Sequence, residues 1–189
     1  MTEAEKPLTY LTELFESPER WVFESQVAFL TSKVDAVLRA KVTDTHFAVI
    51  ERSIYEHFEI FVRAFASYGS LEARSVETFE RLSRLWIDVL PPPLAIIACK
   101  CPPDVCVERL AARRRSTDPV YPPGHITRLG DLLCDWLNRF ELAPVLTIDT
   151  VLNDIRSHEV YTGVAREIEK IAGSSPAEAR YAFSTHRNS

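Results

Sequence analysis

The sequence has 189 residues, of which 46% are hydrophobic and 26% are charged, a composition typical of a globular protein rather than a disordered one. The formal net charge of −5 argues against general binding to nucleic acid or to an anionic membrane. No apolar run approaches the ~20 residues of a membrane-spanning helix, and the acidic N-terminus does not resemble a signal peptide, so we expect a cytoplasmic protein. We predict one domain over residues 1–172 and a flexible tail over residues 173–189, where small and polar residues dominate.

Short apolar runs alternate with segments of helical periodicity along the chain. The runs at 47–50, 94–99 and 144–149 are continuously apolar, as in parallel strands that are covered on both faces. Helical periodicity predicts helices over residues 19–40, 54–68, 75–90, 104–115, 126–140 and 154–172. Strands that alternate with helices predict an α/β fold with a parallel sheet, although helix dominates.

The cysteines are too sparse for a disulfide framework, and their spacing does not match that of zinc ligands. We therefore expect reduced thiols and no metal site built from the protein's own side chains. The four cysteines are Cys99, Cys101, Cys106 and Cys134.

Polar residues follow the predicted strands at the end where α/β proteins bind their ligands. Glu51 and Arg52 follow the first run, Lys100 follows the second, and Asp149 ends the third. An acid and an arginine beside a buried strand are costly unless they pair or meet a ligand. The sequence leaves open both a structural ion pair and a ligand site.

Arginines gather at the end of the predicted helix 104–115, where Arg109 and Arg113 share one face and Arg115 can fold over the same end. Guanidinium groups bind phosphate oxygens and stabilise charge during phosphoryl transfer. The alternative is a solvated helix end, since cations are favourable at a helix C-terminus. This run is also the sole basis for a nucleic-acid-binding module, which the net acidity opposes.

Gln26 lies in the middle of an otherwise apolar helical face, near Trp21, Phe23 and Phe29. Its amide could hydrogen-bond the edge of a base while aromatic rings stack on the base's face, although a buried structural glutamine is the commoner explanation. His57 is the histidine closest in sequence to the strand-end residues Glu51 and Arg52. The sequence contains no Gly-x-x-x-x-Gly-Lys-Ser/Thr phosphate loop.

In their order and spacing, several motifs resemble those of the deoxyribonucleoside kinase family, which includes deoxycytidine, deoxyguanosine and insect-type multisubstrate kinases. Residues 51–55 (Glu-Arg-Ser-Ile-Tyr) are similar to the family's strand-end motif, and 107–115 resembles its arginine-rich lid. Residues 144–149 resemble its late strand, and residues 14–26 fall where the family builds its nucleoside site. The resemblance covers residues 8–149.

The resemblance implies a P-loop kinase-like α/β fold that is helix-rich, carries an arginine lid and is shortened at its N-terminus, without the first strands and the phosphate loop. It implies transfer of the ATP γ-phosphate to the 5′-hydroxyl of a deoxyribonucleoside, with Mg²⁺, in nucleotide salvage. It also leads us to expect a homodimer. The missing loop leaves, as an alternative, a catalytically inactive kinase-like protein that binds nucleosides or acts as a scaffold.

The same resemblance implies roles for individual residues. Glu51 is a candidate base or structural acid beside the 5′-hydroxyl, and Arg52 steadies the reacting oxygen and the transferred phosphate. Gln26 reads the base edge, and Asp118 contacts the 3′-hydroxyl of the sugar. The other residues expected at the nucleoside are Phe15, in place of the family's usual tyrosine, and Phe29, His57 and Phe61. Those expected to clamp phosphates are Arg109, Arg113 and Arg115.

Overall fold

A computed structural model describes residues 10–40, 48–113, 123–154 and 156–173 of the chain. These residues form two compact units, which are described separately. The first comprises Met1–Pro91 with Arg113–Trp136, and the second comprises Pro92–Ala112 with Leu137–Ser189. The single domain expected over residues 1–172 stays a prediction.

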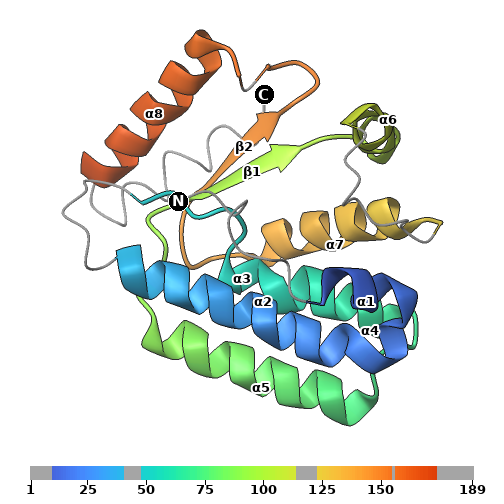
Figure 1. Cartoon of the computed structure of the whole chain (residues 1–189). Helices are drawn as coiled ribbons and strands as arrows, with labels where there is room; N and C mark the ends of the chain where they lie inside the picture. The colour runs from blue at the N-terminus through green and yellow to red at the C-terminus, as the bar shows by residue number, and fades with distance from the viewer. Residues whose placement is uncertain (1–9, 41–47, 114–122, 155, 174–189) are drawn as a thin grey trace. The chain divides into compact units, whose positions relative to one another are not determined.

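The first unit is helical in its described residues (Figure 1). Its longest helix, α2, begins at Pro18, where a proline costs nothing because the first helical N–H has no partner within the helix. Gly69 ends α4 at a φ of 74°, a conformation that glycine adopts without strain. The helical elements of this unit are α1 (Leu11–Glu16), α2 (Pro18–Ala40), α3 (Ile54–Glu56), the π-helical turn η2 (His57–Val62), α4 (Arg63–Ser67), α5 (Ala73–Val89) and the larger part of α7 (His125–Arg139).

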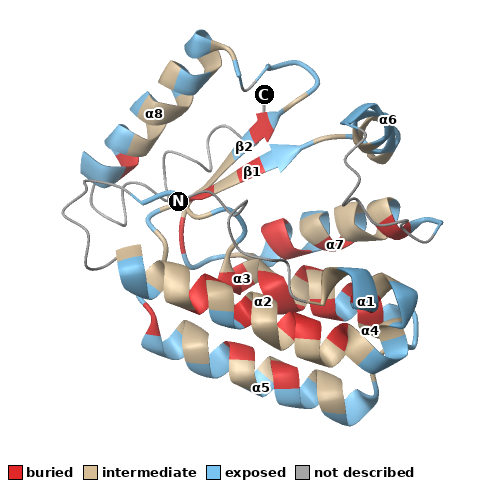
Figure 2. Ribbon diagram, in the orientation of Figure 1, coloured by how far each residue is buried: buried red, intermediate tan, exposed pale blue. Residues whose placement is uncertain are grey.

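The core of this unit lies between α2, α5 and the segment that runs through η2 (Figure 2). Helix α2 turns a stripe of buried residues inward at spacings of three and four, as an amphipathic helix does. In η2, four of the six residues are buried, so this turn is covered on most of its sides. Phe79 of α5 is 1% exposed and meets the Phe23 ring edge-on, which ties α5 to α2.

The helices predicted over 19–40, 54–68 and 75–90 are confirmed within one or two residues at each end. Neither α1 nor the π-helical turn is predicted from the sequence pattern. The strand predicted over 47–50 is wrong for the described residues 48–50, which adopt no strand. Val49 is 81% exposed there, and the sheet of the described residues consists of β1 and β2 alone.

The second unit holds a parallel pair of strands, β1 (Ile96–Lys100) and β2 (Val145–Asp149). In their register Ile96 lies opposite Val145, and Lys100 lies opposite Asp149. The predicted parallel α/β arrangement is thus confirmed for the second and third runs, and it brings their polar ends together. The helices of this unit are α6 (Pro103–Arg113) without its last residue, the end of α7, and α8 (His158–Gly173).

Helix α8 begins four residues after its predicted start at 154. The Asp154 carboxylate accepts a hydrogen bond from the Arg156 backbone, which closes a turn instead of starting a helix. The Ser157 hydroxyl accepts from the Val160 N–H and caps the helix. The tail predicted from residue 173 lies outside the described residues, apart from Gly173 itself. Among the described helices, none is both long enough and apolar enough to span a membrane.

Replacing Phe79 with alanine tests this core. We expect the Phe79→Ala variant to lose about 3–5 kcal/mol of unfolding free energy, because a fully buried ring leaves a cavity. The matched control is Leu85→Ala on the same helix, where the side chain is 64% exposed and the expected change is within about 0.5 kcal/mol. Urea unfolding followed by circular dichroism measures both; equal losses would contradict the assignment of Phe79 to the core.

Candidate functional site

Five residues from three segments of the first unit form one connected group. They are Gln26 and Phe29 of α2, Arg52 just before α3, and His57 and Phe61 of η2. His57 is 4% exposed, and its Nε2 lies 3.2 Å from the Gln26 backbone oxygen. The His57 ring centroid lies 5.9 Å from that of Phe61 and 6.5 Å from that of Phe29. The Arg52 guanidinium lies 4.8 Å from the centre of the Phe61 ring. We call these residues the Gln26–Arg52 group.

His57 is neutral within this group. Burial, helped by the positive charges of Arg52 and Lys33, lowers the pKa of His57 to about 4, although the hydrogen bond to Gln26 opposes the shift. Because a carbonyl oxygen can only accept a hydrogen bond, Nε2 must carry the proton and donate a hydrogen bond to the Gln26 backbone oxygen. His57 therefore holds α2 against η2 at the level of Gln26 and does not act as a proton donor to solvent near neutral pH.

The side chain of Gln26 is buried but incompletely bonded. Gln26 is 3% exposed, and its Nε2 donates a long hydrogen bond of 3.4 Å to the Ser25 hydroxyl. No donor among the described residues reaches Oε1, which is itself buried. A buried acceptor without a partner costs about 1–3 kcal/mol, so this oxygen suits a ligand that brings an N–H group.

Glu51 and Arg52 are exposed at the edge of the same group. Arg52 stacks on Phe61 and has a φ of 56°, in the left-handed region that few residues other than glycine adopt. Its guanidinium therefore places a fixed positive charge beside the buried Gln26 and His57. Glu51 directly precedes it and places a carboxylate at the same edge.

Phe15 lies in a second aromatic cluster of the first unit. Its ring centroid is 6.4 Å from that of Phe65 and 6.4 Å from that of His125. His125 is buried, which lowers its pKa, and its Nδ1 lies 3.2 Å from the Tyr68 hydroxyl. Phe15 packs helix α1 against α4 and the start of α7.

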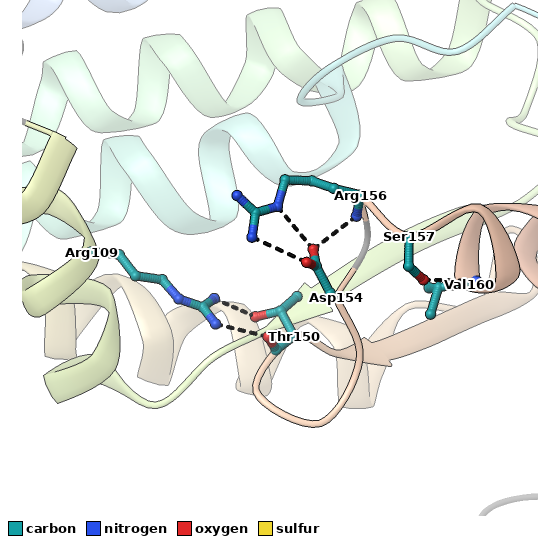
Figure 3. Close-up of polar contacts among 6 residues, drawn as sticks. All are labelled: Arg109, Thr150, Asp154, Arg156, Ser157 and Val160. Carbon is teal, nitrogen blue, oxygen red and sulfur yellow. Dashed lines mark hydrogen bonds and ion pairs between the residues drawn. The ribbon is translucent and has the colours of Figure 1, made fainter.

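Arg109 belongs to the second unit, where it is bonded to the turn that follows β2 (Figure 3). Its Nη1 donates to the Thr150 hydroxyl at 2.9 Å, and its Nη2 donates to the Thr150 carbonyl at 2.8 Å. In this structure Arg109 thus joins α6 to the strand end. Arg113 is the last residue of α6 and is exposed, whereas Arg115 and Asp118 lie outside the described residues.

Sequence reasoning missed two charged residues that contact the Arg52 segment. Lys33 lies in the buried stripe of α2, where a lysine needs a specific partner, and its Nζ donates to the Glu51 carbonyl. Glu56 accepts a hydrogen bond from the Ser53 hydroxyl. The Ser-x-x-Glu spacing of 53–56 is a known signature of a helix start and could have identified this contact.

The described residues contain no group of three or more histidine, cysteine or acidic side chains that could hold a metal ion. Mg²⁺ is commonly bound through one or two carboxylates together with substrate phosphates. We therefore assign no protein ligand to Mg²⁺ and derive no step through it.

The buried, neutral His57 predicts a stability that depends on pH. Because its pKa is lowered on folding, from 6.5 to about 4, its contribution is fully present above pH 6.5 and is lost as the pH falls toward 4. Between pH 7.5 and 5, we expect His57 to account for about 2 kcal/mol of lost unfolding free energy. Urea unfolding of the wild type and of His57→Asn at both pH values measures it; an identical pH dependence in the two proteins would contradict a buried neutral His57.

Comparisons with known proteins show the family of this chain. The sequence profile described as "Deoxynucleoside kinase" matches residues 2–172. A protein of Frog virus 3 (isolate Goorha), named "Putative deoxynucleoside kinase", is similar to this chain, with 28% identity over 157 residues that cover 82% of this chain and 73% of the viral protein. The helix-rich structure with its small parallel sheet is consistent with the α/β fold of P-loop kinase-like proteins. The chain belongs to the deoxynucleoside kinase family.

Proposed function

We propose that this protein is a deoxynucleoside kinase that transfers the γ-phosphate of ATP to the 5′-hydroxyl of a deoxyribonucleoside. The observation that carries the proposal is the Gln26 side chain, which is buried with its Oε1 unpaired among the described residues. The Arg52 charge lies at the edge of the same group of residues. An amide can hydrogen-bond a base and a guanidinium can bind a phosphate, which are two of the contacts that a nucleoside kinase uses.

Base binding would use Gln26, Phe29 and Phe61. The amide of Gln26 offers an acceptor, Oε1, and a donor, Nε2, and a base edge with an adjacent N–H and acceptor can satisfy both. The rings of Phe29 and Phe61 offer apolar faces on which a base can stack. His57 would act indirectly, because its Nε2–H is bonded to the Gln26 backbone oxygen and fixes the place from which the amide projects.

The chemical step would be an in-line displacement at phosphorus. The 5′-oxygen forms a bond to the γ-phosphorus, the bond from that phosphorus to the ADP oxygen breaks, and the hydroxyl proton passes to Glu51. Arg52 would stabilise the negative charge on the transferred group, since its guanidinium is already oriented by Phe61 and by its own backbone.

The remaining roles rest on the family resemblance. Arg113 and Arg115 would clamp phosphates, and Asp118 would contact the 3′-hydroxyl of the sugar. Arg109 would join them only by exchanging its bonds to Thr150 for bonds to phosphate. Phe15 would line the sugar side of the site without donating a hydrogen bond. ATP with Mg²⁺, a role in nucleotide salvage, a homodimer and a cytoplasmic location complete the proposal.

Base recognition by Gln26 is tested by a leucine substitution. We expect Gln26→Leu to weaken deoxynucleoside binding about 10- to 100-fold, because the base loses both amide hydrogen bonds. The matched control is Thr31→Val on the same helix, where the exposed hydroxyl bonds only to the Val27 carbonyl in the described structure. Isothermal titration with each of the four common deoxynucleosides measures the affinities; unchanged binding to Gln26→Leu would contradict the assigned role.

Transfer itself is tested with γ-labelled ATP and the same deoxynucleosides. We expect labelled monophosphate from the wild type and a decrease of orders of magnitude in Arg52→Ala and in Arg113→Ala, because charge stabilisation dominates phosphoryl transfer. Arg39→Ala, which removes an exposed ion pair with Asp35, should transfer at the normal rate. If the wild type binds deoxynucleosides without transferring phosphate, the chain is a kinase-like nucleoside-binding protein instead.

A further inference from the structure

The backbone at Arg52 is held in a conformation that an arginine does not favour. Its φ of 56° lies in the left-handed region, and such a residue persists only when its surroundings fix it. Of the described residues, Tyr10 is the only other non-glycine residue with a positive φ. The contacts on either side of Arg52 therefore decide where its guanidinium points.

On the N-terminal side, the contact comes from α2. The Lys33 Nζ donates a hydrogen bond of 2.9 Å to the backbone oxygen of Glu51, the residue before Arg52. Lys33 is 6% exposed, so the lysine side chain has little room to move. Helix α2 also carries Gln26, so the same helix positions the base-reading amide and the residue before Arg52.

On the C-terminal side, the contact comes from Glu56 in α3. Ser53 follows Arg52, and its hydroxyl donates to the Glu56 carboxylate at 3.3 Å. The Ser53 backbone also bonds to this carboxylate. Burial raises the pKa of Glu56, whereas the Ser53 bonds and the charges of Arg52 and Lys33 act against that rise. The carboxylate thus pins the residue after Arg52 to the helix start.

We propose that Lys33 and Glu56 act as a clamp that fixes the backbone on both sides of Arg52 and holds its guanidinium over Phe61, ready for the 5′-phosphate group of a nucleotide. Neither residue touches the substrate in this proposal; both are positioning residues that act through Arg52. The inference rests on the proposed function, because it assumes that Arg52 meets a phosphate.

The clamp makes a prediction that general stabilisation of the fold does not. If Arg52 swings away, a ligand with a 5′-phosphate loses its partner, whereas a nucleoside without phosphate still meets Gln26. The quantity to measure is therefore the phosphate advantage, defined as the dissociation constant of a deoxynucleoside divided by that of its 5′-monophosphate.

The experiment is isothermal titration of both ligands into the wild type, Lys33→Met, Glu56→Ala, Glu56→Gln and the control Glu80→Ala. We expect the phosphate advantage to fall on the order of tenfold in Lys33→Met and Glu56→Ala, with nucleoside affinity kept within about twofold. Glu56→Gln should keep the advantage, since an amide oxygen still accepts from Ser53. Glu80→Ala removes an exposed pair with Arg84 on α5 and should also keep it.

Each other outcome overturns the clamp in a recognisable way. A phosphate advantage that survives in Lys33→Met and Glu56→Ala shows that Arg52 needs no clamp. An equal loss of affinity for both ligands shows that the two residues support the fold rather than Arg52. If the wild type shows no phosphate advantage, Arg52 does not bind the phosphate. If the wild type binds neither ligand, the proposed function is wrong, and the clamp is wrong as well.

Discussion

The hydrogen bond from His57 to the backbone oxygen of Gln26 is the constraint on which the candidate site depends. It joins α2 to η2 in the interior, where burial keeps His57 neutral with its proton on Nε2. The aromatic rings around His57 exclude water and keep it in that state. A change in the packing around His57 is therefore expected to change its protonation and the position of Gln26.

Different interactions hold the functional residues in place in the two units. In the first, burial of rings and of a few polar groups holds the residues of the candidate site in place. In the second, parallel strand pairing brings Lys100 and Asp149 to one edge, and Arg109 fastens α6 to the turn that follows. A bond that an arginine makes to its own protein competes with any bond to phosphate. Arg109 therefore has a structural role that the lid motif alone does not indicate.

Part of the candidate site could be predicted because two of its residues lie on a regular helix and a sequence motif contains another. Gln26 and Phe29 share α2 with a clear periodicity, and the Glu-Arg-Ser motif marked the loop that carries Arg52. The strand at 47–50 could not be judged from its apolar residues, because a strand also needs a neighbour. The π-helical turn and the bond from Lys33 to Glu51 depend on packing between segments distant in sequence, which local patterns do not record.

The central claim is that Gln26 and Arg52 bind opposite ends of one nucleotide, and a crystal structure of the chain with a deoxynucleoside 5′-monophosphate tests it most directly. The account predicts a base N–H within about 3.2 Å of Gln26 Oε1, a base against the Phe29 or Phe61 ring, and the phosphate on the Arg52 guanidinium. A bound nucleotide that leaves Gln26 Oε1 unpaired, or that places its phosphate away from Arg52, would contradict the account.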